Sequence, residues 1–222
     1  MKFQLFRKIG FTITDPIALV EAFCSQSDFY ANFDAAPVRE RQIEHVNRIG
    51  ARIDSRLLAD CKRIIENTKS LGFFGYDNDL DSFLRLDTKE MNELIEEFNQ
   101  KAVKGLLKKG IGLSKATKVL HTFHPETVPM IDNPLQKLYL ERINSGWVPG
   151  DPHIFTDYYT NFLEGGTWKN LNAISAKLSG SSLTLTRVRI FDILWWSCLK
   201  SRTKMPNCRE NSARLLVGLR SK

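Results

Sequence analysis

The chain has 222 residues, of which 42% are hydrophobic, and a formal net charge of +7. This length allows one domain or two closely packed lobes with a substantial core, and no apolar run approaches the roughly 20 residues that span a bilayer. Residues 1–8 have neither the apolar segment nor the small-residue cleavage site of a signal peptide, so we expect a cytoplasmic protein without a membrane partner.

The cysteines are spread along the chain, at Cys24, Cys61, Cys198 and Cys208. Their spacing fits neither a zinc site nor an iron–sulfur cluster, both of which need closely spaced ligands. We therefore expect reduced structural thiols, no bound metal and no cofactor.

Two short segments open the chain, 3–6 and 11–13, and their pattern fits either strands or an extended arm. Asp15 and Pro16 then favour a helix start, because Asp can cap the first amides and Pro fits the first turn. We expect this helix to run to about Cys24.

The next helix is predicted from about Val38 to Asp54, with apolar residues at helical spacing on its inner side. Gly50 in its middle costs about 1 kcal/mol relative to Ala, which indicates close packing at that point. The other sides carry polar residues that include Asn47 and Arg48. Asp54 either ends this helix or caps the one that follows.

A Gly-rich aromatic loop is predicted over 71–79, with Phe73, Phe74 and Tyr76 between its glycines. Such side chains can stack on bases or wedge between them, and they can equally fix a loop onto the core; the sequence leaves both open. The next amphipathic helix is expected to begin at Thr88, although its Thr-x-x-Met spacing is not a capping box.

Residues 106–120 combine two glycines with the start of a helix. Gly110 and Gly112 interrupt the preceding helix, and Ser114 opens an amphipathic one. The glycines can expose backbone N–H groups and the new helix adds the positive end of its dipole, so the loop can hold an anion. The surrounding lysines include Lys108, Lys109 and Lys115. This arrangement suits a nucleic-acid phosphate, although Gly-x-Gly before a helix is also ordinary turn chemistry.

A Pro-rich stretch, 124–134, follows this helix and contains Asp132. Asn133 and Pro134 can open another helix that runs to about Ile143. Asp132 fits two roles, a catalytic carboxylate or the N-cap of that helix. The remaining helices are expected over 57–68, 154–163, 171–178 and 185–200.

The region of about 105–140 resembles the helix-hairpin-helix (HhH-GPD) DNA glycosylase superfamily, which includes endonuclease III, the adenine glycosylases and the 8-oxoguanine glycosylases. The matching residues are Gly110-Ile111-Gly112, Ser114, Ala116 and Asp132, and Asp132 comes 18 positions after Ser114. The resemblance implies a mainly α, two-lobed helical fold over residues 1–222, without the iron–sulfur cluster of some members. Residues 105–134 would then form the helix-hairpin-helix and the catalytic turn.

The same resemblance implies a function, the excision of a damaged or modified base from double-stranded DNA. Asp132 would stabilise the sugar cation, and the hairpin with its lysines would bind phosphate while the nucleotide is flipped out. Residues of the base pocket or wedge would include Asn47, Arg48, Phe73, Phe74 and Tyr76. Ser114 replaces the lysine that forms a Schiff base in bifunctional members, which favours a monofunctional enzyme. We expect a nucleoid-associated monomer.

The distribution of charge is consistent with a nucleic-acid partner. Residues 101–142 carry eight Lys and Arg against three acidic residues, and 187–222 carry nine against two. Two other classes of protein remain open, a non-catalytic helix-hairpin-helix DNA-binding protein in repair or phage defence, and a structural protein. Asp192 lies three residues after Arg189 and is expected to form a buried pair with it on one helix face. The alternative is that Asp192 is a second catalytic carboxylate beside Asp132.

Overall fold

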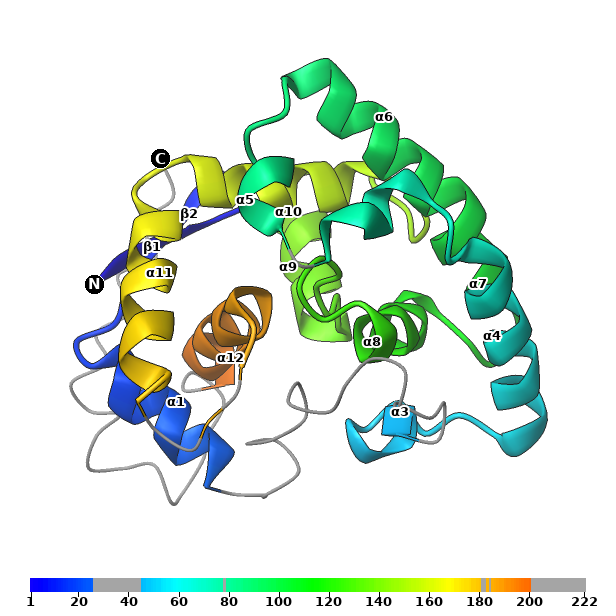
Figure 1. Cartoon of the computed structure of the whole chain (residues 1–222), viewed down its shortest axis with the longest axis horizontal. Coiled ribbons are helices and arrows are strands. Elements are labelled where there is room, and N and C mark those ends of the chain that lie inside the picture. Colours follow the sequence, from blue (N-terminus) through cyan, green and yellow to red (C-terminus); the bar gives the residue numbers. More distant parts are fainter. Residues whose placement is uncertain (26–44, 78, 181–182, 184, 201–222) are drawn as a thin grey trace. The chain divides into compact units, whose positions relative to one another are not determined.

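The computed structural model describes residues 1–25, 45–77, 79–180, 183 and 185–200. Over these ranges the chain is mainly helical, as the sequence predicted, and one small antiparallel sheet near its start shows that the two N-terminal segments are strands (Figure 1). The chain divides into two compact units, Met1–Ala35 with Asp157–Lys222 and Ala36–Thr156. None of the described helices is long and apolar enough to cross a membrane.

The first unit is built from a β-hairpin and four helical segments. Its elements are β1 (Lys2–Leu5), β2 (Ile9–Thr12), α1 (Pro16–Cys24), most of α10 (His153–Leu163), α11 (Thr167–Leu178) and α12 (Arg187–Lys200). Both α1 and α11 pack against α12, and α11 also contacts β1 (Figure 1). Phe3 pairs with Phe11 across the strands, with ring centroids 5.4 Å apart. Asp15 caps α1 as predicted, by accepting the amide of Ala18.

A buried polar group lies in the core of this unit. Asp192 is 3% exposed and accepts hydrogen bonds from the hydroxyl of Tyr158 at 2.7 Å and the indole of Trp195 at 3.1 Å. Burial and the adjacent Asp192 carboxylate raise the pKa of Tyr158 well above its ordinary value. Arg189 is also buried, with its guanidinium over the ring of Phe23. These contacts give Asp192 a structural role.

The second unit holds the segments on which the functional expectations rest. Its helices are α3 (His45–Arg48), α4 (Ser55–Thr68), α5 (Leu80–Phe83), α6 (Thr88–Phe98), α7 (Lys104–Leu106), α8 (Leu113–Phe123) and α9 (Asn133–Arg142). A 3₁₀ turn, η2 (Gly72–Tyr76), precedes α5, and a π-helical turn, η3 (Asn99–Val103), joins α6 to α7. Both α4 and α8 pack against η3, so the hairpin between α7 and α8 rests on a compact helical support.

Side-chain caps set the starts of α4 and α6. Asp54 caps α4 by accepting the amide of Arg56 at 2.9 Å, which settles its predicted role. Asp87 caps α6 and forms a capping box with Glu90. The predicted start at Thr88 is confirmed, but the capping box begins one position before it and was not predicted from the sequence.

The predicted helix through Gly50 is wrong. Its expected start at Val38 lies outside the described residues, and the described part, α3, ends at Arg48. Gly50 has a φ of +78° and Arg52 a φ of +51°, both incompatible with a right-handed helix. The Asn47 side chain explains the turn, since it donates to the carbonyl of Ile53 and accepts from its amide.

Candidate functional site

Residues 107–112 form a tight hairpin between α7 and α8. Lys108 and Ile111 exchange both of their main-chain hydrogen bonds, at 3.1 and 2.9 Å, and so form an isolated antiparallel bridge. Gly110 closes the turn with a φ of +91°, and α8 begins directly after Gly112. The local path of the chain is therefore a short helix, a tight hairpin and a longer helix.

The two glycines of the hairpin have different structural status. At Gly110 the positive φ excludes most side chains, and a Cβ would lie 3.1 Å from Cδ1 of Leu57. Gly112 has a φ of −85°, which any residue adopts. Apart from Gly112 itself and its two chain neighbours, no described residue has an atom within 4 Å of the position that a Cβ on Gly112 would take. The turn thus explains Gly110, whereas Gly112 leaves open space at an exposed position.

The start of α8 offers backbone donors beside that open space. Gly112 is the N-cap residue, and no side chain in the described ranges caps this helix. The amides of Leu113 and Ser114 belong to the first turn, where a helix has no internal acceptor for them. Ser114 is half-buried as the second residue of α8. With the helix dipole, these amides can bind an anion that approaches over Gly112.

The three candidate lysines have different environments. Lys108 donates to Asp60 of α4 at 2.6 Å, and this bond and charge lower the pKa of the Asp60 carboxyl below its ordinary value. Lys115 donates to two main-chain oxygens, that of Gly110 at 2.9 Å and that of Arg52 at 3.1 Å. Lys109 is exposed at the tip of the turn. Of the three, Lys109 is the side chain that the fold leaves available for a phosphate.

Asp132 is the N-cap residue of α9 and is half-buried. One oxygen of its carboxylate accepts the amide of Leu135 at 3.3 Å, a capping contact that uses part of its acceptor capacity. The capping role that the sequence allowed for Asp132 is therefore present. A carboxylate can accept further hydrogen bonds, so this contact is compatible with a catalytic role.

The segment that leads to Asp132 is fixed by side chains of the flanking helices. The hydroxyl of Thr117, on α8, accepts the amide of Ile131 at 3.0 Å and donates to the carbonyl of Leu113 at 3.0 Å. Gln136, on α9, donates to the carbonyl of Ile131 at 2.9 Å. The peptide groups of Ile131 are thus held from both sides, which places Asp132 beside the first turns of α8. Sequence reasoning missed Thr117, because a Thr in a helix gives no signal of its long-range partner.

The expected base-stacking role is wrong for two of the aromatic residues in this structure. Phe73 is 0% exposed and stacks on Phe98 with ring centroids 4.4 Å apart. Phe74 is 6% exposed and stacks on the imidazole of His124 at 3.6 Å. Their rings fill the core, as the alternative interpretation proposed, because packing buries far more of their surface than a loop could. Tyr76 is half-buried and contacts Phe83 edge to face.

The His124 ring belongs to a hydrogen-bonded cluster below the 124–131 turn. Its Nδ1 hydrogen bonds with one oxygen of Asp77, and the hydroxyl of Thr127 donates to the other. His121 contacts the carbonyl of Val128 through Nδ1 at 2.7 Å. The aromatic loop therefore braces the turn that precedes Asp132 and does not extend from the surface.

The two polar residues predicted for the base pocket have different outcomes. Asn47 is exposed but uses its amide to close the 49–53 loop, so its contacts are structural. The side chain of Arg48 lies outside the described part of the chain. Asn47, the loop it closes and the hairpin all belong to the same unit, and Lys115 links the last two directly.

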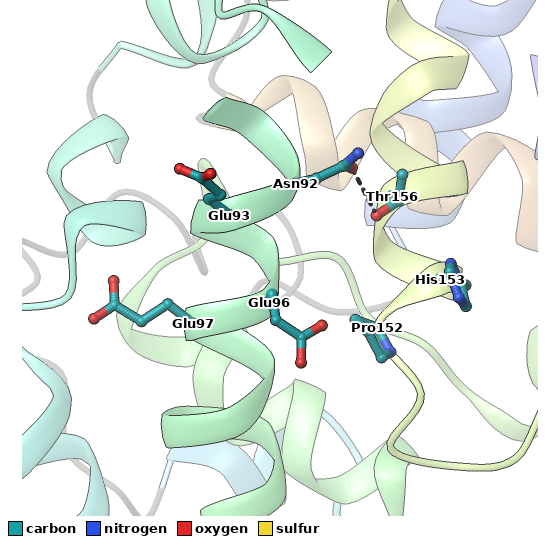
Figure 2. A pocket seen from close by; sticks show the side chains of 7 residues that line it. All are labelled: Asn92, Glu93, Glu96, Glu97, Pro152, His153 and Thr156. Carbon is teal, nitrogen blue, oxygen red and sulfur yellow. Dashed lines mark hydrogen bonds between the residues drawn. The ribbon is translucent and has the colours of Figure 1, made fainter. Parts of the chain in front are cut away.

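A pocket of about 560 Å³ lies elsewhere in this unit, between α6 and the first turn of α10 (Figure 2). The residues that line it are Asn92, Glu93, Glu96, Glu97, Pro152, His153 and Thr156. Figure 2 shows Asn92 meeting Thr156 through a hydrogen bond, with Glu93 and Glu97 extending from α6 away from His153. Its three glutamates would repel a phosphate backbone, so this pocket is not suited to nucleic acid.

Metal binding and thiol chemistry both depend on how the His, Cys, Asp and Glu side chains are placed. Among the described residues, no group of three or more His, Cys, Asp or Glu side chains is arranged to hold a metal ion. Cys24, Cys61 and Cys198 are buried and unbridged, and burial raises the pKa of the Cys61 thiol; Cys208 lies outside the described residues.

Comparison with protein-family models, curated proteins and solved structures finds no significant match to this chain.

Proposed function

We propose that the protein is a monofunctional DNA glycosylase that binds double-stranded DNA through the 107–112 hairpin and uses Asp132 for catalysis. The observation that carries this proposal is the open space at Gly112. The fold itself has no need of a glycine there, yet a Cβ at that point would obstruct a phosphate on the uncapped start of α8. The exposed charge of Lys109 adds long-range attraction for DNA.

The catalytic part of the proposal rests on the place of Asp132. Breaking an N-glycosidic bond develops positive charge on the sugar, and a fixed carboxylate stabilises that charge. The Thr117 and Gln136 hydrogen bonds hold the adjacent peptide and limit the movement of Asp132. The base leaves with the electron pair of the broken bond, water adds to the anomeric carbon of the sugar cation, and the proton that the water loses passes to the departed base. The product is an abasic site with an intact DNA backbone.

The absence of lyase chemistry follows from the side chains near the start of α8. Ser114 cannot form a Schiff base with an opened sugar. The ammonium group of Lys115 donates hydrogen bonds to the carbonyl oxygens of Gly110 and Arg52, and these contacts hold it at the two turns. The proposed reaction is therefore hydrolysis without a covalent enzyme–DNA intermediate.

A second candidate function is non-catalytic binding of DNA by the same hairpin. The observation in its favour is the capping contact between Asp132 and the amide of Leu135, which gives Asp132 a structural purpose. The two functions make the same prediction for affinity and opposite predictions for base release.

The full chain tests the choice when it is incubated with duplexes that carry different damaged and modified bases. Alkali then cleaves any abasic site, and borohydride is added to parallel samples. We expect strand cleavage after alkali for at least one substrate and no borohydride-trapped adduct. Binding of the duplexes without any base release would favour the non-catalytic alternative, and a trapped adduct would contradict the monofunctional mechanism.

Lys109 should contribute a phosphate contact. We expect Lys109→Gln to reduce the slope of log affinity against log salt by about 0.9, the value of one B-DNA phosphate contact. The control is Lys89→Gln, since Lys89 is 85% exposed on α6 of the same unit beside Glu93. Fluorescence anisotropy of a labelled duplex at several salt concentrations measures both slopes. Equal slopes for the two variants would remove Lys109 from the interface.

A further inference from the structure

The 49–53 loop is held in an unusual conformation beside the hairpin. Gly50 and Arg52 both have positive φ, and for Arg52 this left-handed conformation is strained. Gly50 and Arg52 are nevertheless exposed, while Ile49, Ala51 and Ile53 between and beside them are buried. The loop is therefore anchored by alternate apolar residues and presents the other two outward.

Side chains from two helices fix the outward-facing peptides of this loop. Lys115 of α8 donates to the carbonyl of Arg52 at 3.1 Å, and Lys118 of α8 donates to the carbonyl of Gly50 at 3.4 Å. Asn47 of α3 closes the loop through its two hydrogen bonds to Ile53. Exposure to solvent does not by itself favour one conformation of this strained loop. The hydrogen bonds from Asn47, Lys115 and Lys118 hold it in the observed conformation.

The same ammonium group also holds the hairpin. Lys115 bonds the carbonyl of Gly110 at 2.9 Å while it bonds that of Arg52, so one side chain joins the tips of both turns. The carbonyl of Arg52 is thereby held to the same ammonium group as the carbonyl of Gly110, two residues before Gly112, and Arg52 is an exposed cation. A guanidinium suits the planar, bidentate recognition of a phosphate.

From this geometry we propose that the 49–53 loop is a second DNA-binding element, in which Arg52 contacts a backbone phosphate and Lys115 is a positioning residue. This proposal rests on the proposed binding of DNA by the hairpin and adds a residue to it. It also assigns Lys115 a different role from the phosphate contact expected from the sequence. Lys115 acts through the Arg52 loop, because main-chain oxygens already occupy two of its three N–H donors.

The test is a double-mutant cycle on duplex affinity with Arg52→Gln, Lys115→Met and the combined variant. Arg52→Gln should reduce the salt slope by about 0.9, and the combined variant should lose about the same single contact. Lys115→Met should weaken binding in the wild-type background and have a smaller effect when Arg52 is already changed, because the two residues share one contact. Arg85→Gln, at an exposed arginine between α5 and α6, is the matched control.

The outcomes separate this inference from the proposed function. Wild-type affinity and slope in Arg52→Gln would overturn the inference and leave the hairpin proposal intact. A combined variant that loses about two contacts would show that Lys115 binds phosphate itself. A wild-type protein that does not bind any duplex would overturn the proposed function, and with it the role of Arg52. Thermal unfolding of each variant corrects every affinity for the folded fraction.

Discussion

Asp132→Asn should abolish base excision while the protein still folds and binds DNA. Asn keeps the size of the side chain and an oxygen that can cap α9, but it carries no charge to stabilise the sugar cation. We expect the single-turnover excision rate to fall about a thousandfold or more, which corresponds to about 4 kcal/mol of transition-state stabilisation. The measurement uses a substrate identified with the lesion panel and enzyme in excess over DNA.

The capping role of Asp132 requires its own controls. Asp132→Ala removes the charge and the cap together, so it should also cost about 1 kcal/mol in the free energy of unfolding. Asp54→Asn makes the same chemical change at the N-cap of α4 and should excise at the wild-type rate. Near wild-type excision by Asp132→Asn would show that the carboxylate serves α9 alone.

Gly112→Val should weaken duplex binding strongly with little change in thermal stability. The φ of Gly112 suits any residue, and no described atom would meet its Cβ, so the folded state should tolerate the substitution. A phosphate would instead be kept away from the first amides of α8. Hydrogen bonds to a charged group contribute about 1.5–3 kcal/mol each, so the loss of two would weaken binding about a hundredfold or more.

Gly110→Ala is the matched control for this result. Its backbone has a φ of +91° and its Cβ would crowd Leu57, so we expect a loss of about 1–3 kcal/mol in the free energy of unfolding. Calorimetry and anisotropy on both variants separate the two effects. A Gly112→Val variant that unfolds early yet binds normally, after correction for the folded fraction, would show that this glycine is structural.

Local signals in the sequence were sufficient for much of the helical structure. Asp15, Asp54 and the Asn133-Pro134 pair mark real helix starts, because capping and first-turn chemistry depend on residues that adjoin in the chain. The two-glycine hairpin was predictable for the same reason. Its turn needs a residue with positive φ, and Gly110 supplies it.

Contacts between distant residues were not predictable in the same way. The helical period continued through Gly50, and nothing nearby indicated that Asn47 would bond Ile53 and turn the chain. Phe73 and Phe74 gave a pattern common to base-stacking loops and to buried turns, and only the packing on Phe98 and His124 distinguishes them. The lysines around the hairpin are equivalent in the sequence pattern. In the structure they differ, because Lys108 pairs with Asp60 and Lys115 donates to two carbonyl groups.

The support of the hairpin limits how small a working fragment could be. Its shape depends on Asp60 and Leu57 of α4, and through Lys115 it is joined to the loop that Asn47 closes. A peptide cut from 104–132 would therefore lack Asp60, Leu57 and the loop that Asn47 closes. Without these partners, Lys108 and Lys115 could adopt other arrangements. A fragment that keeps the structure of the hairpin would have to begin at about α3 and include the helices that precede the hairpin.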